Sequence, residues 1–233
     1  MIFITGDTHR KFSRVVEYIE QDIIKEGDIL IILGDVGINY YTDSSDIQLK
    51  KKLNKLGITL FCVQGNHELR PENLDTYKLV EWNGGMVYIE EEFPNLVFAK
   101  DGEIYTLEDK KYLVCGGAYS VDKEVRILRG LHWFKDEQPS KENLKILEEN
   151  LCEVDYKVNY VLTHTCPQKY TPTEAFMSGV DQSKVDRSTE IALDKIEDKL
   201  EYDKWFCGHW HINKTIDKIE FMFEKLKMVS EKP

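Results

Sequence analysis

Short, largely apolar runs alternate with stretches of helical periodicity over the first quarter of the chain. Residues 1–5, 29–33 and 58–63 are the apolar runs, as in strands that are buried on both faces. Between them, residues 12–23 and 43–57 show helical spacing and helix-starting residues. This β-α-β-α-β order predicts an α/β fold in which parallel strands are joined by right-handed crossovers.

From about residue 85 the pattern changes to short alternating runs, at residues 86–89, 96–99, 104–107 and 112–115. Turn-forming residues separate these runs, which therefore predict a more antiparallel set of strands. The later elements are predicted to be a helix capped by Ser140, a strand at 159–163, a helix at about 187–200, a strand at 204–207 and closing strands at 219–223.

No linker, low-complexity tract or internal repeat divides these elements. We therefore expect residues 1–233 to form a single domain. Its predicted architecture is a four-layer α/β/β/α sandwich, in which two mixed sheets pack together and helices cover both outer faces.

Composition narrows the range of functions. The net charge of -11 gives no overall attraction to nucleic acid or anionic membranes. The longest aliphatic run, at residues 29–33, is far shorter than the roughly 20 residues of a membrane span, and the N-terminus lacks a secretory signal pattern. The five cysteines include no CxxC pair, which is typical of reduced thiols. These features predict a cytoplasmic protein with no membrane partner.

Side chains that bind metals directly follow the predicted strands. Five of the six histidines occupy such positions, and the exception is His132. The carboxyl ends of strands in an open α/β sheet border the ligand crevice, so these side chains are expected to converge. Mixed imidazole and carboxylate groups favour zinc, iron, manganese and similar ions over calcium or magnesium. The residues are Asp7, His9, Asp35, Asn66, His67, His164, His209 and His211.

Each short motif is weak when it is taken alone. Asp7-x-His9 is ordinarily a surface pair, and Gly34-Asp35 is an ordinary turn. The run from Gly65 to Glu68 could begin a helix, with Asn66 as its cap. Five such segments in order, each at a strand end, favour a metal site instead.

The five segments together resemble the calcineurin-like metallophosphoesterases. That family has the ordered signature Asp-x-His, Gly-Asp, Gly-Asn-His-Asp/Glu, a later His, and Gly-His-x-His. In this chain the blocks are Asp7-Thr8-His9, Gly34-Asp35, Gly65-Asn66-His67-Glu68, His164 and Gly208-His209-Trp210-His211. The resemblance spans residues 7–211 and implies the family's four-layer α/β/β/α fold. The chain is similar to single-domain members of the bacterial or phage type.

The resemblance also implies two divalent transition-metal ions. Manganese is expected first, with iron, zinc, nickel or cobalt as alternatives. One ion would be held by Asp7, His9 and His211, the other by Asn66, His164 and His209, with Asp35 as the bridge between them. In the family, a water shared by the ions attacks phosphorus.

Two residues are expected to carry most of the chemistry. Asp35 bridges the ions, and His67 matches the family's histidine that is not a ligand but contacts the phosphate and helps to protonate the leaving oxygen. Asn66 and His67 are therefore also expected to contact substrate.

One departure concerns the second block. Protein Ser/Thr phosphatases of this superfamily continue it as Gly-Asp-x-Val-Asp-Arg-Gly, whereas this chain reads Gly-Asp-Val-Gly-Ile-Asn-Tyr over residues 34–40. The phosphate-binding arginine of those enzymes is missing here, although Glu68 resembles that branch.

Residues 116–139 allow two interpretations. In the first they form a substrate-recognition flap, in which Arg126 and Arg129 bind phosphate and aromatic side chains stack on a base. In the second, a short amphipathic helix starts at Lys123 and packs Val125, Leu128 and Trp133 inward, with the arginines solvated. His132 is expected to be structural.

The sequence predicts a hydrolase of phosphomonoesters or phosphodiesters that acts on a small phosphate ester or a nucleotide, with nucleic acid as an open alternative. A Ser/Thr protein phosphatase-like or dinucleoside-polyphosphate phosphatase activity is the second hypothesis, disfavoured by the missing arginine. A non-catalytic scaffold is the third, and it is disfavoured because every ligand position keeps a competent side chain. The sequence does not indicate the oligomeric state.

Overall fold

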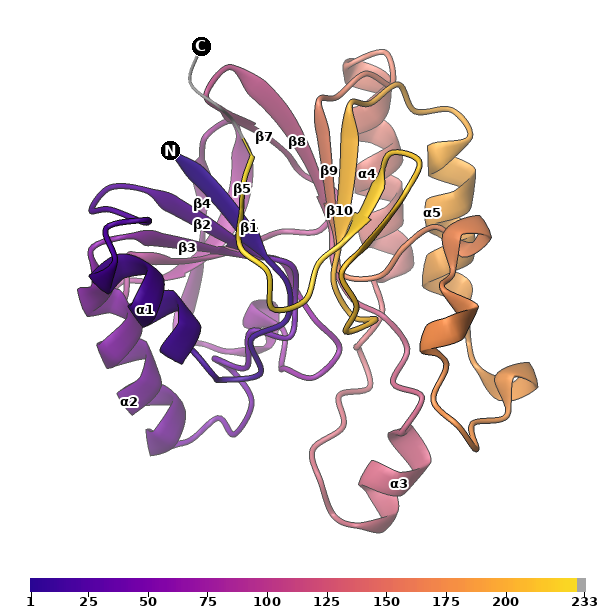
Figure 1. Ribbon diagram of the computed structural model, residues 1–233, viewed down its shortest axis with the longest axis horizontal. Helices are drawn as coiled ribbons and strands as arrows, with labels where there is room; N and C mark the ends of the chain where they lie inside the picture. Colours follow the sequence, from indigo (N-terminus) through magenta and orange to yellow (C-terminus); the bar gives the residue numbers. More distant parts are fainter. Residues whose placement is uncertain (230–233) are drawn as a thin grey trace.

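The computed structural model describes residues 1–229. These residues form two mixed sheets that lie face to face (Figure 1). Within the described residues, the first sheet has seven strands in the order β13 (Lys227–Met228), β1 (Ile2–Thr5), β2 (Ile29–Ile32), β3 (Thr59–Cys62), β6 (Leu96–Ala99), β5 (Gly85–Glu90) and β4 (Tyr77–Trp82). The second has six, in the order β11 (Lys214–Ile216), β12 (Ile219–Phe221), β10 (Lys204–Cys207), β9 (Tyr160–Thr163), β8 (Lys110–Cys115) and β7 (Ile104–Leu107), again counting residues 1–229.

Helices cover the outer faces of both sheets. Figure 1 shows α1 (Ser13–Glu20) and α2 (Ser44–Leu53) outside the first sheet, and α4 (Lys141–Glu153) and α5 (Ser188–Glu197) outside the second. The short helix α3 (Lys123–Leu128) projects away from the body of the protein. The predicted four-layer α/β/β/α fold is confirmed.

The apolar runs identified in the sequence form the central strands. β1, β2 and β3 pair in parallel, as the β-α-β-α-β pattern predicts. Side chains from both sheets meet in one core, which includes the buried residues Ile4, Phe61, Tyr105, Leu162 and Phe206. Fully burying a side chain of this size stabilises a fold by about 1.5 to 3 kcal/mol, so this inter-sheet layer holds the two halves together.

Side-chain caps fix where two of the helices begin. The Oδ1 atom of Asp43 accepts a hydrogen bond from the backbone N–H of Ser45 at 2.8 Å, at the start of α2. The Oγ atom of Ser140 accepts one from the backbone N–H of Asn143 at 3.1 Å, at the start of α4, as predicted. Such caps are each worth about 1 kcal/mol.

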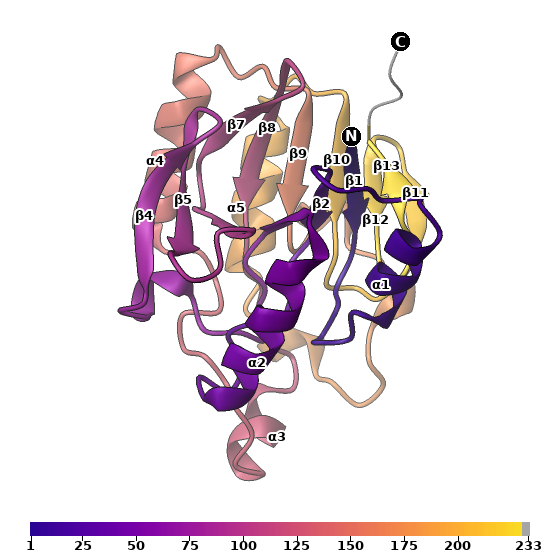
Figure 2. The same ribbon diagram turned by 90° about the vertical axis from the view of Figure 1, so that its left-hand side faces the viewer.

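The carboxyl ends of the parallel strands share one side of the molecule. Figure 2 shows β8 and β9 pointing toward the side from which α3 projects. β9 and β10 pair in parallel, so the loops that follow them leave the second sheet at this same edge. This edge is where the candidate site forms.

Three local expectations differ from the structure. The edge strand β4 was not predicted, because it exposes Leu79 and Val80 and so lacks the apolar alternation of a half-buried strand. The helix expected to reach Ile23 ends at Glu20, which leaves the Ile23 side chain 40% exposed. The strands expected to be antiparallel are so only in part. β5 pairs with β6 and β7 with β8 in antiparallel orientation, but β6 pairs with β3 and β8 with β9 in parallel.

Cys62, Cys115 and Cys207 are buried free thiols, as predicted from their apolar surroundings. Burial raises their pKa well above the usual value, which keeps them in the unreactive thiol form. Among residues 1–229, none of the helices has both the length and the apolar character needed to cross a bilayer.

Candidate metal centre

Loops after five strands bring the seven predicted ligands together. These loops follow β1, β2, β3, β9 and β10. Four of the ligands have left-handed backbone conformations, with φ values of 44° at His9, 45° at Asp35, 64° at His209 and 50° at His211. Non-glycine residues adopt this region at an energetic cost, and such strain gathers at functional sites. The surrounding fold therefore holds these side chains in place against local preference.

The first cluster consists of Asp7, His9 and His211. The Oδ2 atom of Asp7 lies 3.2 Å from Nε2 of His211 and 3.7 Å from Nε2 of His9, and the two imidazole nitrogens are 2.9 Å apart. Oδ2 is buried and accepts no well-aligned hydrogen bond from the described residues, whereas Oδ1 accepts one from the backbone N–H of His209 at 2.9 Å. One carboxylate oxygen is thus fixed, and the other faces two imidazoles.

The second cluster centres on the Oδ1 atom of Asn66. Nε2 of His164 lies 2.7 Å from this oxygen, and Nδ1 of His209 lies 3.1 Å from it. The amide nitrogen of Asn66 donates a hydrogen bond to the Oγ atom of Ser120 at 2.8 Å, which turns the amide oxygen toward the two imidazoles. Ser120 was not predicted from the sequence, because nothing in the local motif indicates it.

Hydrogen bonding sets the tautomer of His164. Its Nδ1 atom lies 2.7 Å from the carbonyl oxygen of Leu33, which can only accept, so Nδ1 carries the proton. In the neutral imidazole, Nε2 then presents a lone pair toward the oxygens of Asn66 and Asp35. Orienting the free nitrogen through a hydrogen bond to the other one is typical of metal-binding histidines.

Asp35 lies between the two clusters. Its Oδ1 atom is 3.6 Å from Nε2 of His164, and its Oδ2 atom is 3.9 Å from Nδ1 of His9. Burial acts to raise the pKa of this carboxyl, but the neighbouring His164, His67 and His9 outweigh burial and lower it. Burial, followed by His164, lowers the pKa of His209 to about 3, so that imidazole is neutral at neutral pH.

These donor atoms fit divalent cations. Atoms that share one transition-metal ion at about 2.0 to 2.2 Å lie roughly 3 to 3.5 Å from one another, close to the separations in the first cluster. Electron-rich atoms repel one another at such distances unless a cation or a proton lies between them. A further set of three side chains, which overlaps both clusters, also has potential ligand atoms within 4.8 Å of one another: Asp7, Asp35 and His164.

Two glycines allow the loops to approach this closely. A Cβ atom on Gly34, where φ is 91°, would lie 2.2 Å from Nδ1 of His164. A Cβ atom on Gly65 would lie 2.0 Å from the backbone nitrogen of Asp35. Side chains larger than hydrogen are therefore excluded at both positions, which explains why glycine precedes Asp35 and Asn66.

Glu68 braces the loops that follow β2 and β3. Its carboxylate is fully buried and accepts hydrogen bonds from the backbone N–H groups of Val36 at 3.1 Å, Gly37 at 2.8 Å and Gly65 at 3.3 Å. Burial and the charge of Asp35 raise the pKa of Glu68 to about 8, against these three donors, which favour the charged form. No helix begins at Asn66, and the next helical element is a short 3-10 helix at Pro71–Asn73, so the alternative of a helix capped by Asn66 was wrong.

His67 and Arg126 meet at the edge of the centre. The backbone N–H of His67 donates to Oδ1 of Asp35 at 2.8 Å, and one guanidinium nitrogen of Arg126 lies 3.3 Å from Nε2 of His67. The Nε atom of Arg126 also donates to Asp122 at 2.7 Å. Burial lowers the pKa of His67, with Asp35 opposing the shift and Arg126 adding to it.

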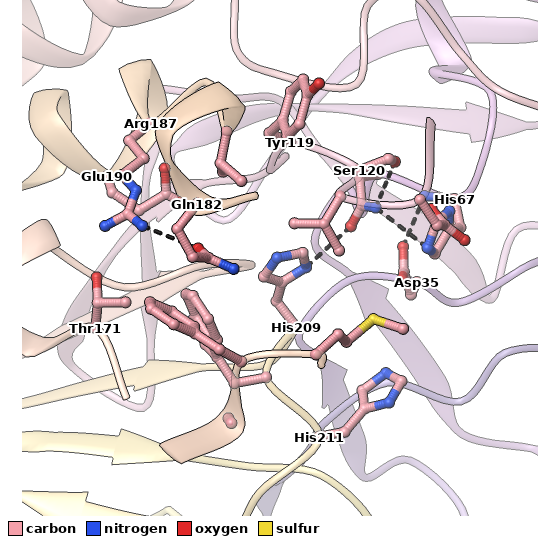
Figure 3. A pocket seen from close by; sticks show the side chains of 18 of the residues that line it. Asp35, His67, Tyr119, Ser120, Thr171, Gln182, Arg187, Glu190, His209 and His211 are labelled. Atoms are coloured by element: carbon pink, nitrogen blue, oxygen red, sulfur yellow. Dashed lines mark hydrogen bonds between the residues drawn. The ribbon is translucent and has the colours of Figure 1, made fainter. Parts of the chain in front are cut away.

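A cavity of about 420 Å³ opens beside the centre (Figure 3). Asp35, Asn66, His67, His9, His209 and His211 form one part of its lining, and Arg126 also lines it. Another wall comes from the long segment between β9 and α5, which contributes Phe176, Gln182 and Arg187. The sequence predicted neither a helix nor a strand in this segment. Its length of more than twenty residues between strand and helix was the available signal, since loops of that size are usually functional.

Residues 116–139 match neither the predicted substrate-recognition flap nor the predicted inward-packed helix completely. Helix α3 exists, but Leu128 is 87% exposed and Val125 is 46% exposed, so the predicted inward packing of these two side chains was wrong. Arg126 reaches the cavity, whereas Arg129 is exposed and lies outside its lining. His132 is exposed and packs against Tyr40, with ring centroids 5.2 Å apart.

Two mixed sheets with imidazole and carboxylate groups converging beyond the strands define a metal-binding α/β protein. The family model of the calcineurin-like phosphoesterases matches residues 1–213. The chain therefore belongs to this family, a family of metal-dependent hydrolases, and the predicted resemblance is confirmed.

Solved structures share the fold at low sequence identity. The structure of TT1561 from Thermus thermophilus aligns with a TM-score of 0.51 and 12% identity, over 95% of this chain and 87% of that one. Phosphopantetheinyl hydrolase (PptH) from Mycobacterium tuberculosis aligns with a TM-score of 0.45 and 13% identity, over 95% and 87% of the two chains. The first likeness concerns the fold alone, and the second is too weak to support an argument. No curated protein matches the chain significantly.

Proposed function

We propose that this chain is a binuclear metal-dependent phosphoesterase that hydrolyses a phosphomonoester or a phosphodiester. Two clusters of oxygen and imidazole groups lie on either side of Asp35, and this observation carries the proposal. A single site would need only one of them. The substrate proposed is a small phosphate ester or a nucleotide, handled by a single domain in the cytoplasm.

The proposed ligands divide between two ions. Asp7, His9 and His211 would hold one divalent ion, and Asn66, His164 and His209 the other, with Asp35 shared. The ions would supply Lewis-acid chemistry, lowering the pKa of a water nucleophile and neutralising charge on the phosphoryl oxygens. Manganese is proposed first, since mixed imidazole and carboxylate sites accept it together with iron, zinc, nickel or cobalt.

His67 is proposed to contact the phosphate and to protonate the leaving oxygen. Its backbone N–H is fixed to Asp35, so the imidazole stands beside the proposed bridge and lines the cavity. Burial lowers the pKa of the His67 imidazole, so its protonated form needs a neighbouring anion, and a bound phosphate would supply that charge.

Arg126 is proposed to bind the phosphate. The second sequence block lacks the arginine that protein phosphatases carry there, but the guanidinium of Arg126 reaches His67 from a different segment. A guanidinium fork pairs with phosphoryl oxygens through two parallel hydrogen bonds. Arg129 stays a weaker candidate because its side chain is exposed outside the cavity lining.

A protein phosphatase activity is the second candidate, and its only specific support in the sequence is Glu68. Because the Glu68 carboxylate is occupied with three backbone N–H groups, its presence has a structural reason that is independent of substrate class. A simple phosphoesterase therefore remains the better proposal.

The test is a paired assay with manganese on p-nitrophenyl phosphate and bis-p-nitrophenyl phosphate. Asp35→Asn keeps an acceptor oxygen for the His67 N–H and removes the charge, so turnover should vanish while folding persists. His67→Ala should lower kcat by about 10² to 10⁴. His132→Ala, at an exposed histidine outside the cavity, is the matched control and should retain activity.

The preferred ester in this assay would define the substrate class. Full turnover by Asp35→Asn would refute the binuclear proposal. Elemental analysis of each protein would show whether lost activity accompanies lost metal, with about two ions per chain expected for the unmodified protein.

A further inference from the structure

We propose that Arg187 forms a second oxyanion site in the same cavity, so that the preferred substrates are phosphoesters carrying an additional phosphate or carboxylate group. This inference rests on the proposed function, because the first phosphate is taken to bind at the metal centre. It concerns the wall formed by the segment between β9 and α5, to which the mechanism above assigns no role.

Arg187 is a cation without an ion-pair partner among the described residues. It stands immediately before α5, is half-buried, and lines the cavity. One guanidinium nitrogen donates to Oε1 of Gln182 at 3.0 Å, and the guanidinium carbon lies 5.5 Å from the centre of the Phe176 ring. Within residues 1–229, no carboxylate oxygen lies within 4.0 Å of its guanidinium nitrogens. Most of its N–H donors are therefore left for a ligand.

Gln182 extends the donor set toward the metal centre. Because its Oε1 atom accepts from Arg187, its amide nitrogen faces the other way. Figure 3 shows the Gln182 side chain between Arg187 and His209, with Asp35 and His67 on the far side of His209. The guanidinium of Arg187 and the amide nitrogen of Gln182 can both donate to a group with several oxygens, such as a phosphate or a carboxylate.

The acidic side chains that line the cavity do not cancel this charge. Asp122 is paired with Arg126 at 2.7 Å. Glu190 is 6% exposed, and its Oε1 atom accepts from the hydroxyl of Thr165 at 2.8 Å. Glu190 influences Arg187 electrostatically but lies beyond ion-pair distance. Asp35 belongs to the metal centre. Within the described residues, none of these three acidic side chains forms an ion pair with Arg187.

The position of Arg187 explains why a second anion is preferred to a neutral group. A half-buried guanidinium loses part of its hydration, and an oxyanion restores that loss through charge-assisted hydrogen bonds. Phe176 supports one face of the guanidinium at cation–π distance, which fixes the plane in which its N–H groups point. A substrate whose far end is cationic or neutral would not form these charge-assisted hydrogen bonds with Arg187.

The test compares n-butyl phosphate with the α,ω-alkanediol bisphosphates from ethylene to hexamethylene, using phosphate release with manganese. The readout is the ratio of kcat/KM for each bisphosphate to that for butyl phosphate. We expect a ratio of about ten at the best chain length, and its loss in Arg187→Gln. Arg187→Lys should restore part of it, because the charge returns without the planar fork.

Lys184→Gln is the matched control, since Lys184 lies on the same segment, loses the same charge on substitution, and has a side chain that is 83% exposed. It should keep the full ratio. Phosphates whose far end carries a carboxylate form a second series, which decides whether the site prefers phosphate or carboxylate.

Isothermal titration calorimetry on manganese-loaded protein gives a readout that does not depend on hydrolysis. Alkane bisphosphonates should bind more tightly than butylphosphonate to the unmodified protein, by about tenfold, and equally to Arg187→Gln. A ratio near one in the unmodified protein, or an unchanged ratio in Arg187→Gln, would overturn the inference. If neither these esters nor the two p-nitrophenyl esters are hydrolysed, the proposed function fails, whereas the calorimetric comparison still decides the second site.

Discussion

Replacing Glu68 by alanine tests whether a buried carboxylate holds the two central ligand loops together. The side chain accepts N–H groups from Val36 and Gly37, which follow Asp35, and from Gly65, which precedes the next ligand. Removing it leaves three buried N–H groups without these acceptors.

The expected cost follows from those three bonds. An unsatisfied buried donor costs about 1 to 3 kcal/mol, and water that enters the vacated space recovers part of this. We therefore expect the free energy of unfolding to fall by about 3 kcal/mol. For a chain of this length, 1 kcal/mol corresponds to roughly 2 to 4 °C, so Tm should fall by about 6 to 12 °C. Metal affinity should fall about 10- to 100-fold, because the loops that carry Asp35 and Asn66 lose their brace.

Thermal denaturation followed by circular dichroism measures the first effect, and metal titration measures the second. Glu92→Ala is the control, because this side chain is 66% exposed and only 3.4 Å from Lys51 in a surface pair. Its cost should stay within about 0.5 kcal/mol. A Tm change below about 2 °C for Glu68→Ala would refute the reasoning, since it would mean that the three N–H groups need no side-chain acceptor.

Three further predictions concern the surroundings of the centre. Gly34→Ala should abolish binding of one metal equivalent, measured by elemental analysis, because the new Cβ atom would overlap the imidazole of His164. Ser120→Ala should weaken metal binding by about tenfold in a titration, because the Asn66 amide loses the acceptor that orients it. Leu128→Ser should change the free energy of unfolding by less than about 0.5 kcal/mol in urea, because this side chain is 87% exposed.

The sequence predicted the central strands and the residues at their ends. Parallel strands buried on both faces must be apolar throughout, so β1, β2 and β3 stand out without any structural information. A ligand that follows such a strand has its position fixed by the strand. The convergence of Asp7, Asp35 and Asn66 therefore follows from local pattern together with one rule about sheet edges.

Hydrophobic periodicity did not predict burial correctly for a helix that has no element packed against it. Val125 and Leu128 have the spacing of an amphipathic helix, but α3 projects from the body, which leaves Val125 46% exposed and Leu128 87% exposed. The spacing shows which side chains share a face, and it does not show whether another element lies against that face. Edge strand β4 illustrates the converse, because it pairs along its backbone while exposing Leu79 and Val80.

The two arginines that line the cavity show why chemistry was easier to predict than substrate. Neither Arg126 nor Arg187 belongs to a metal-ligand motif, and each reaches the cavity from a long segment whose path depends on tertiary packing. A residue that holds a metal needs a fixed position, and the predicted ligands follow strands, where the sequence pattern reveals them. Substrate-binding groups need only reach the cavity, so many loop positions can supply them. Substitutions at Arg187 should therefore change which ester is preferred, whereas substitutions at Asp35 should remove hydrolysis of all of them.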